Sequence, residues 1–288
     1  MKILVAIPHY FGGDKQSGDK NAINRSMRPQ ARQERVMALA RVLSGLQTAF
    51  GFHAFGLNHC KGRARRLKPA HQLDVVVVTR PDCHLLGELP LPLRPTIRHA
   101  QADCDPLRLG FIAHRILAEQ GEAYDYCVYL EDDVAIHDPL FFAKRRAFDA
   151  KFGPMALLQP QRYEIGGQQL QRKLYVDWAL TYRRTKAYQN IADKPRLSLE
   201  FGGDVYDLKR TSYPSSGCFV LNAEQRRIWR ESPAFLDGDE SYFSPLDSAA
   251  TLSVMKTFRI YKPSLDHSWF FEVEHVSPRW ISLLEPGG

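Results

Sequence analysis

The sequence lacks long apolar runs and has few cysteines. Its longest apolar stretches, such as residues 75–78 and 127–130, have the length of a strand and fall far short of the roughly 20 residues that span a bilayer. The five cysteines show no Cys-x-x-Cys spacing, and their odd number disfavours a disulfide framework or a structural zinc site. We therefore expect no transmembrane helix, and we expect the cysteines to be reduced thiols that are mostly buried.

The chain also shows no internal repeat and no low-complexity tract, which argues against fibrous and disordered proteins. A secretory signal is not expected either. The apolar start is followed by Pro8 and His9, where a cleavage site would need small residues, so it is better interpreted as a first strand. We therefore expect a cytoplasmic protein.

What the sequence does have is a moderate positive charge. Its 288 residues include 39 Lys and Arg against 32 Asp and Glu, a formal net charge of +7, and 44% of the residues are hydrophobic. Such a chain can bury a sizeable core, and it is long enough for one large domain or two fused halves.

Much of the positive excess comes from two basic stretches, residues 25–41 and 61–68. Stretches of this kind bind nucleic acid, bind anionic lipid headgroups or simply form a solvated surface. No helix-turn-helix, RNP or zinc-finger pattern is present, and we place these residues in a loop and on the polar face of a helix, so nucleic acid is not expected as a partner. A solvated surface is the default interpretation. A peripheral contact with the inner face of a membrane is the alternative, and sedimentation with anionic liposomes tests it.

Strand and helix patterns alternate through the first half of the chain. Three runs have the composition of buried parallel strands: residues 2–7, 74–79 and 126–130. Two helices are predicted between them. One has an apolar stripe over residues 36–50, and the other begins at Asp105 and Pro106. This alternation predicts an α/β fold, a mainly parallel sheet with helices on both faces.

The second half is less regular. We predict short strands at residues 155–159 and 217–221. A helix capped by Asn222 follows, and a second helix is predicted at residues 246–257, before a final strand at residues 258–261. Residues 162–212 are rich in Arg, Lys, Tyr and Gln and show no clear period. The expected organisation is one large domain of two abutting halves, residues 1–135 and 136–288.

Three acidic residues, Glu131, Asp132 and Asp133, directly follow the predicted strand 126–130. Ligands of parallel sheets bind outside the carboxyl ends of the strands. Adjacent carboxylates at such a place repel one another and need a cation, and hard ions such as Mg²⁺ or Mn²⁺ use carboxylates together with substrate phosphates. The alternative is a solvated helix-capping cluster, which is disfavoured because Asp138, next to Pro139, is the better cap.

The order of elements around this acidic triplet resembles the nucleotide-sugar half of the GT-A glycosyltransferases. The triplet itself, followed by Val134, is most similar to the N-acetylglucosaminyltransferase I type. The resemblance implies that Asp133 binds a divalent metal, Mn²⁺ or Mg²⁺, and that Asp132 and Glu131 lie near the donor.

A second part of the resemblance concerns the segment PLDSAATLSVMKTFRIYKPS. It is similar to the helix that carries the general base in inverting GT-A enzymes, and this implies that Asp247 is the base, although the family usually has two adjacent acids here. The competing bases are Asp237, Asp239 and Glu240. The structural alternative is that Asp247 is only a helix N-cap.

The same family often completes its metal site with a late histidine, which is His267 or His275 in this chain. A single late histidine is otherwise a structural residue. By position, Gly217 in the segment SSGCFVLNAEQ is expected to lie under the sugar together with Ser216, with an ordinary turn into a strand as the alternative.

The resemblance also places donor-binding residues after the first two strands. Pro8, His9 and Tyr10 correspond to the loop that holds the nucleotide base, and Arg80 is positioned to meet uracil or a phosphate.

The function implied is transfer of a hexosyl or N-acetylhexosaminyl group from a nucleotide diphosphate sugar, with UDP expected first, to a hydroxyl of a glycan or lipid-linked acceptor. Aromatic residues of the segment 162–212, namely Trp178, Tyr182 and Tyr188, are candidates for the acceptor site. The alternatives are a nucleotidyltransferase and a non-enzymatic polyanion-binding module. Inversion or retention at the anomeric carbon is left open.

Overall fold

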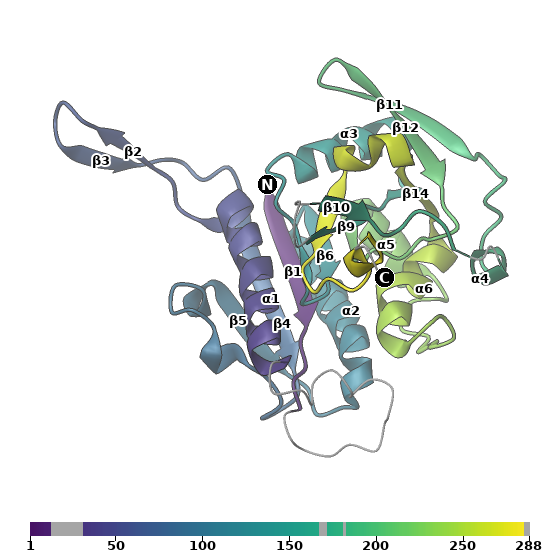
Figure 1. Cartoon of the computed structure of the whole chain (residues 1–288), viewed down its shortest axis with the longest axis horizontal. Coiled ribbons are helices and arrows are strands. Elements are labelled where there is room, and N and C mark those ends of the chain that lie inside the picture. Colours follow the sequence, from purple (N-terminus) through teal and green to yellow (C-terminus); the bar gives the residue numbers. More distant parts are fainter. Residues whose placement is uncertain (13–30, 167–171, 181–182, 285–288) are drawn as a thin grey trace.

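The computed structural model describes residues 1–12, 31–166, 172–180 and 183–284. It confirms the predicted α/β class, with a five-stranded sheet in the order β13-β6-β1-β4-β5 at its centre (Figure 1). These strands are β1 (Lys2–Pro8), β4 (Gln72–Thr79), β5 (Ile97–Gln101), β6 (Tyr126–Leu130) and β13 (Cys218–Asn222). All neighbouring pairs are parallel except β13 and β6. The sheet is therefore mainly parallel, as expected.

Helices cover both faces of this sheet. Alternate residues of β1 point to opposite faces. Ile3, Val5 and Ile7 belong to the same apolar cluster as α1 (Ala31–Leu46), which a π-helical turn extends to Gly51. Leu4 and Ala6 belong to the cluster of α2 (Leu109–Gln120) and α6 (Pro245–Thr257) on the other face. Helix α5 (Ala223–Glu231) begins with a capping box between Asn222 and Gln225, so the predicted cap is confirmed.

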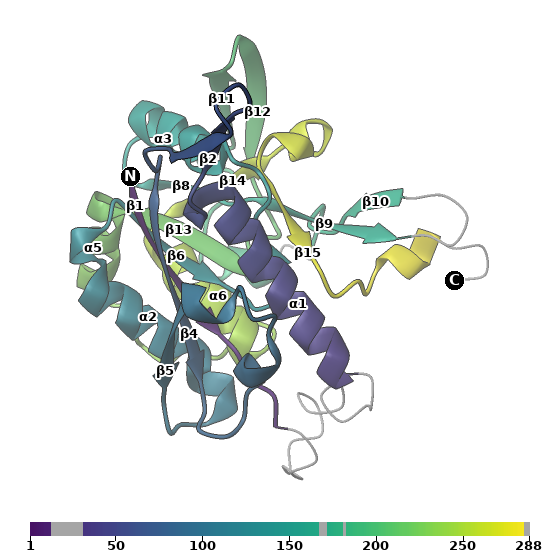
Figure 2. The same cartoon turned by 90° about the vertical axis from the view of Figure 1, so that its left-hand side faces the viewer.

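Two smaller sheets pack beside the central one (Figure 2). The first has the order β10-β9-β15-β7, namely Arg172–Tyr175, Gln161–Gly166, Glu272–His275 and Val134–Ala135. The second has the order β11-β12-β14-β8, namely Arg196–Phe201, Asp204–Arg210, Arg259–Pro263 and Ala156–Leu158. Helices α3 (Phe141–Phe152) and α4 (Arg183–Lys186) complete this half. The aperiodic segment 162–212 thus contributes to four strands.

The structure corrects one expectation about the basic stretches. Residues 61–68 are not only a loop, because Arg63–Arg66 forms strand β3, which pairs with β2 (Phe55–Asn58) in a hairpin. In the other stretch, residues 25–30 lie outside the described residues. The boundary near residue 135 stays a prediction, and strand β13 of the second half joins the sheet of the first.

All five cysteines are free, and three of them are buried. None of the helices within the described residues is both long enough and apolar enough to cross a lipid bilayer.

One buried histidine ties helix α2 to helix α6. His114 has no exposed surface, and its Nε2 donates to the backbone carbonyl of Ala249 at 2.8 Å. Its Nδ1 is buried without a hydrogen-bond partner, and rings of Tyr129, Phe219 and Trp229 surround it. Burial lowers the pKa of His114 to about 4, although the hydrogen bond to Ala249 partly opposes this shift.

This histidine predicts an acid-sensitive stability. A group whose folded pKa is depressed from 6.5 to about 4 stabilises the fold fully above pH 6.5 and loses this contribution as the pH falls toward 4. The contribution of His114 is roughly 3 kcal/mol at 1.36 kcal/mol per pKa unit. Urea unfolding of the His114→Gln variant should show a pH dependence flatter than wild type by about this amount between these two pH values. Parallel pH curves for the two proteins would contradict the assignment.

Candidate active site

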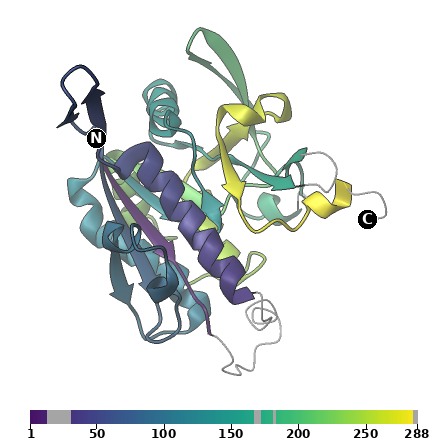
Figure 3. The ribbon, with the colours of Figure 1, turned by 60° about the vertical axis from the view of Figure 1, so that its left-hand side comes forward.

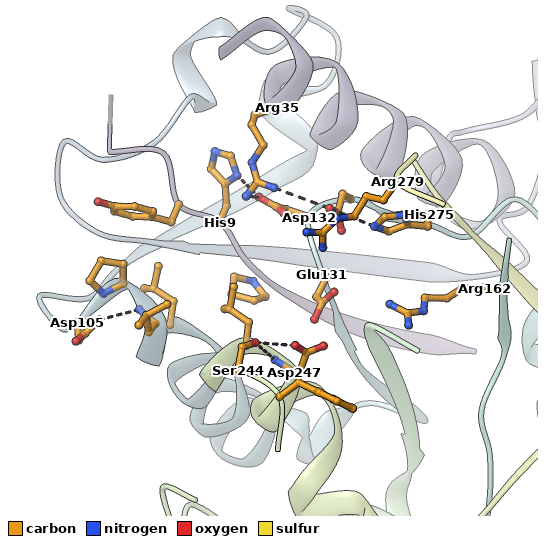
Figure 4. A pocket seen from close by; sticks show the side chains of 18 of the residues that line it. His9, Arg35, Asp105, Glu131, Asp132, Arg162, Ser244, Asp247, His275 and Arg279 are labelled. Carbon is orange, nitrogen blue, oxygen red and sulfur yellow. Dashed lines mark hydrogen bonds and ion pairs between the residues drawn. The ribbon is translucent and has the colours of Figure 1, made fainter. Parts of the chain in front are cut away.

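A cavity of about 590 Å³ opens at the carboxyl ends of β1 and β6 (Figure 4). Parallel strands end at the same edge of a sheet, so residues that follow them converge there. Nine of the residues predicted for the catalytic, metal and donor sites line this cavity: Pro8, His9, Tyr10, Arg80, Glu131, Asp132, Asp133, Asp247 and His275. Ser216, Gly217 and His267 do not line it.

Asp132 is held in place by a histidine and an arginine. Its Oδ2 lies 2.6 Å from His9 Nδ1 and 3.1 Å from Arg35 Nη2. The N–H of Leu85 donates to His9 Nε2, so Nε2 accepts and the proton of a neutral His9 is on Nδ1, facing Asp132. Burial raises the pKa of Asp132, but Arg35 and His9 outweigh it and hold the pKa below its ordinary value. Asp132 is therefore an ionised anchor of this wall.

Asp133 lies close to His275. The distance from Asp133 Oδ2 to His275 Nε2 is 3.8 Å, and the antiparallel register of β15 and β7 explains it, because His275 pairs with Val134. The other ring nitrogen, Nδ1, is 2.8 Å from Glu164 Oε1. A carboxylate on one nitrogen of an imidazole fixes the ring and leaves the other nitrogen to act as a ligand.

Asp133 and His275 have the chemistry of metal ligands. No group of three or more His, Cys, Asp or Glu side chains within the described ranges is arranged to hold a metal. Two protein ligands nevertheless suit Mg²⁺ or Mn²⁺ when phosphate oxygens and water supply the rest. The two side chains therefore fit a metal that binds together with a phosphate-bearing ligand.

Glu164 is fully buried in strand β9, and sequence reasoning did not identify it. Besides His275, it accepts hydrogen bonds of 2.8 Å from the backbone N–H groups of Arg279, Trp280 and Ile281. Burial raises the pKa of Glu164, but His275 and these three N–H groups outweigh it and lower the pKa. Glu164 thus fixes both His275 and the segment that brings Arg279 and Trp280 to the cavity.

The Glu164→Gln variant replaces one acceptor oxygen by an NH₂ group that faces N–H donors. We expect a loss of roughly 2–3 kcal/mol in the free energy of unfolding, because buried donors lose a charged partner. Urea unfolding followed by tryptophan fluorescence measures it. Glu200→Gln, at an exposed position of strand β11, is the matched control and should leave stability unchanged. Equal stability of both variants would show that the Glu164 network contributes little.

Glu131 faces the cavity between Asp132 and Arg162 (Figure 4). Burial, together with Asp133 and Asp247, raises the pKa of Glu131 well above its ordinary value. Gly217 lies behind it with φ of +62°, and a Cβ at Gly217 would come within 2.7 Å of Glu131 Oε2. Gly217 therefore leaves room for the Glu131 side chain, and its carbonyl accepts from the Glu131 N–H at 2.8 Å.

A buried cationic cluster under the cavity was also missed in the sequence. Arg162 lines the cavity, pairs with Asp177 at 2.9 Å and donates to the Tyr213 hydroxyl at 3.2 Å. Lys262 contacts the same Asp177 at 2.8 Å. Burial lowers the pKa of Lys262 to about 8, although Asp177 opposes the shift. Two cations share one buried carboxylate, so this wall favours an anionic group in the cavity.

Asp247 lies at the start of α6, and its side chain points toward that of Glu131 (Figure 4). It is not the N-cap, because Ser244 has that position and accepts from the Asp247 N–H at 3.1 Å. The Ser244 hydroxyl in turn donates to Asp247 Oδ2 at 2.7 Å.

The competing acids do not line the cavity. Asp237 and Asp239 both pair with Lys256, at 2.7 and 2.6 Å, and Glu240 pairs with Arg108 at 3.1 Å. Among the acids proposed as the base, the structure therefore brings only Asp247 to the cavity.

The remaining expectations have mixed outcomes. His267 Nδ1 accepts from the Asp207 N–H at 2.9 Å, so only His275 of the two late histidines reaches the site. Trp178 is 73% exposed and does not line the cavity. Tyr188 bonds to Ser241, and Tyr182 lies outside the described residues. Aromatic residues that do line the cavity include Tyr213 and Trp280, together with Phe243.

No protein-family model and no curated protein matches the chain. Solved structures with a partly similar backbone include that of S. aureus TarS, at 11% identity and a TM-score of 0.46, over 92% of this chain and 35% of that one. They also include TarS 1–349 in complex with UDP, at 10% identity, a TM-score of 0.44 and coverage of 92% and 58%. The complex of TarS 1–349 with UDP-GlcNAc has 12% identity, a TM-score of 0.44 and coverage of 97% and 61%. The chain thus spans about one third to three fifths of the length of these proteins.

Proposed function

We propose that this protein is a metal-dependent glycosyltransferase that moves a sugar from a nucleotide diphosphate sugar to an acceptor hydroxyl. The observation that carries the proposal is the meeting of Asp133 and His275 with Asp247 in one cavity at the carboxyl edge of a parallel sheet. Two side chains that can hold a metal, and a separate carboxylate that can accept a proton, are the two elements that such a transfer needs.

The nucleotide sugar donor would bind beside Asp133 and His275. When bound there, Mg²⁺ or Mn²⁺ would neutralise the diphosphate and stabilise it as the leaving group. Arg35 and His9 hold the neighbouring Asp132, and the fixed charge of Arg162 adds to the attraction for phosphate. Tyr10 and Arg80 are the residues we assign to the nucleotide, with UDP as the first nucleotide to test.

The acceptor would bind on the Asp247 side. The Ser244 hydroxyl engages Oδ2 of Asp247, so we assign proton abstraction from the acceptor hydroxyl to Oδ1. Tyr213 and Trp280 offer aromatic faces to a sugar ring. The acceptor class we propose is a glycan or a lipid-linked glycan, within glycan biosynthesis in the cytoplasm, and the transferred group is hexosyl or N-acetylhexosaminyl.

The experiment is a thermal-shift screen of nucleotide sugars with and without Mn²⁺, followed by a product assay on the donors that bind. The proposal expects stabilisation that depends on both ligands and release of a nucleoside diphosphate. Release of pyrophosphate from a nucleoside triphosphate would instead identify a nucleotidyltransferase. Salt-sensitive binding of polyanions without any effect of Mn²⁺ would indicate a binding module.

A further inference from the structure

The hairpin of β2 and β3 projects away from the body of the molecule (Figures 1 and 3). Its two strands pair with each other and with no other strand of the described chain. Every residue of the two strands is exposed except Gly56, which is half-buried. A lone two-stranded hairpin is marginally stable in water, so an exposed one gains from a second surface against which to pack.

The hairpin carries charge of one sign. No acidic residue occurs between Glu34 and Asp74. Five cations lie on or beside the hairpin and all are exposed: Lys61, Arg63, Arg65, Arg66 and Lys68. A surface that binds here must therefore be anionic.

The hairpin also exposes large apolar side chains. Phe55 is 61% exposed and Leu57 is 59% exposed. The register pairs Phe55 with Arg66 and Leu57 with Ala64, so both apolar side chains lie on one face. Arg63 and Arg65 lie on the opposite face, because successive residues of a strand alternate.

These features together select the kind of partner. A second copy of the hairpin would bring like charges together, and a nucleic acid backbone would leave the apolar face in water. An anionic bilayer accommodates both, because Phe55 and Leu57 enter the boundary of headgroups and acyl chains while Arg66, on the same face, and Lys61, in the turn, meet the phosphates. We propose that the β2–β3 hairpin docks this protein onto an anionic lipid bilayer, with Phe55 and Leu57 inserted.

The hairpin lies near the start of β1, whereas the cavity opens after the end of β1 at Pro8 (Figure 1). Docking through the hairpin therefore leaves the mouth of the cavity uncovered. The proposal does not depend on the function proposed for the cavity, and its test requires no activity.

The experiment is co-sedimentation of the whole chain with phosphatidylcholine vesicles that contain or lack phosphatidylglycerol. Binding is expected only with the anionic lipid. Each Lys or Arg near the surface contributes about 1 kcal/mol, so Lys61→Ser with Arg66→Ser should weaken binding roughly 25-fold. Phe55→Ser with Leu57→Ser should weaken it by at least about tenfold, since each buries apolar area.

Matched controls use exposed residues elsewhere. Arg227→Ser with Arg230→Ser on α5 removes the same charge, and Val205→Ser on β12 removes an apolar side chain that is 57% exposed. Both controls should bind vesicles like wild type. Circular dichroism of all variants should be unchanged, because the hairpin pairs with no other strand of the described chain.

A second readout uses Cys60, the exposed cysteine in the turn of the hairpin, in a Cys104→Ser background. An environment-sensitive thiol probe on Cys60 should shift to the blue with anionic vesicles and not with soluble heparin. Failure to bind anionic vesicles overturns the proposal. Binding of soluble heparin without a probe shift on anionic vesicles also overturns it. If the wild type is a dimer and the Phe55→Ser, Leu57→Ser variant is a monomer, the hairpin binds a second copy of the chain instead, and the proposal is wrong.

Discussion

The Asp133→Ala variant should lose metal-dependent nucleotide binding. Asp133 and His275 are the two side chains that fit a cation beside a diphosphate, and their closest approach is 3.8 Å. Loss of an outer partner of a metal ligand already costs 10–100-fold, so removal of the ligand itself should weaken the affinity for UDP in the presence of Mn²⁺ by about 100-fold or more. Titration calorimetry with and without Mn²⁺ measures this directly.

The design separates a metal role from a structural one. Asp133 lies beside Glu131 and Asp132, so removing its charge relieves repulsion and should leave the melting temperature unchanged or higher. His275→Ala should show the same loss of Mn²⁺ dependence, whereas Asp193→Ala at an exposed turn should bind like wild type. An unchanged affinity of Asp133→Ala for UDP with Mn²⁺ would reject the metal site.

The Asp247→Asn variant should retain donor binding and lose turnover. The substitution keeps the size of the side chain and an oxygen that can accept from Ser244, but it removes the proton acceptor. General base catalysis contributes roughly 10²–10⁴-fold, so kcat should fall by this factor while the affinity for the donor stays the same.

The other acids of the same region provide the control. Asp239→Asn breaks one of the contacts to Lys256 at a position that does not line the cavity, and it should leave kcat unchanged. If Asp239→Asn lowers kcat and Asp247→Asn does not, Asp239 is the general base and the assignment of Asp247 is wrong.

The sequence predicted four of the five strands of the central sheet, because these four are largely buried on both faces, and it did not predict β5, in which three of the five residues are exposed. Residues 126–130 are fully apolar or aromatic, and such a run has few alternatives to a buried strand once its length is known. Capping signals at Asp105 and Asn222 act locally. Asn222 caps α5 as predicted, whereas Asp105 caps a short 3₁₀ turn, Pro106–Arg108, and α2 begins only at Leu109. The strands within residues 162–212 were not predicted, for the opposite reason. In β9, the buried positions hold the polar residues Gln161, Arg162 and Glu164. The hydrophobic pattern of a buried strand would require apolar residues there.

The cavity shows the same division. Residues that directly follow β1, β4 and β6 had to meet, because parallel strands deliver their carboxyl ends to one edge. Arg35 gave no signal, since an arginine on a helix is usually solvated. Its role depends on the packing of α1 beside Asp132.

The sequence alone determined the alternation of strands and helices and the place of the acidic triplet, since both follow from local composition and chain order. Only the tertiary structure decided which distant residues complete the site. His275 reaches Asp133 through a strand register across more than 140 residues, and Glu164 is tolerated without exposure because four donors converge on it. Burying a charge is unfavourable until its partners are in place, and those partners are brought together by the fold.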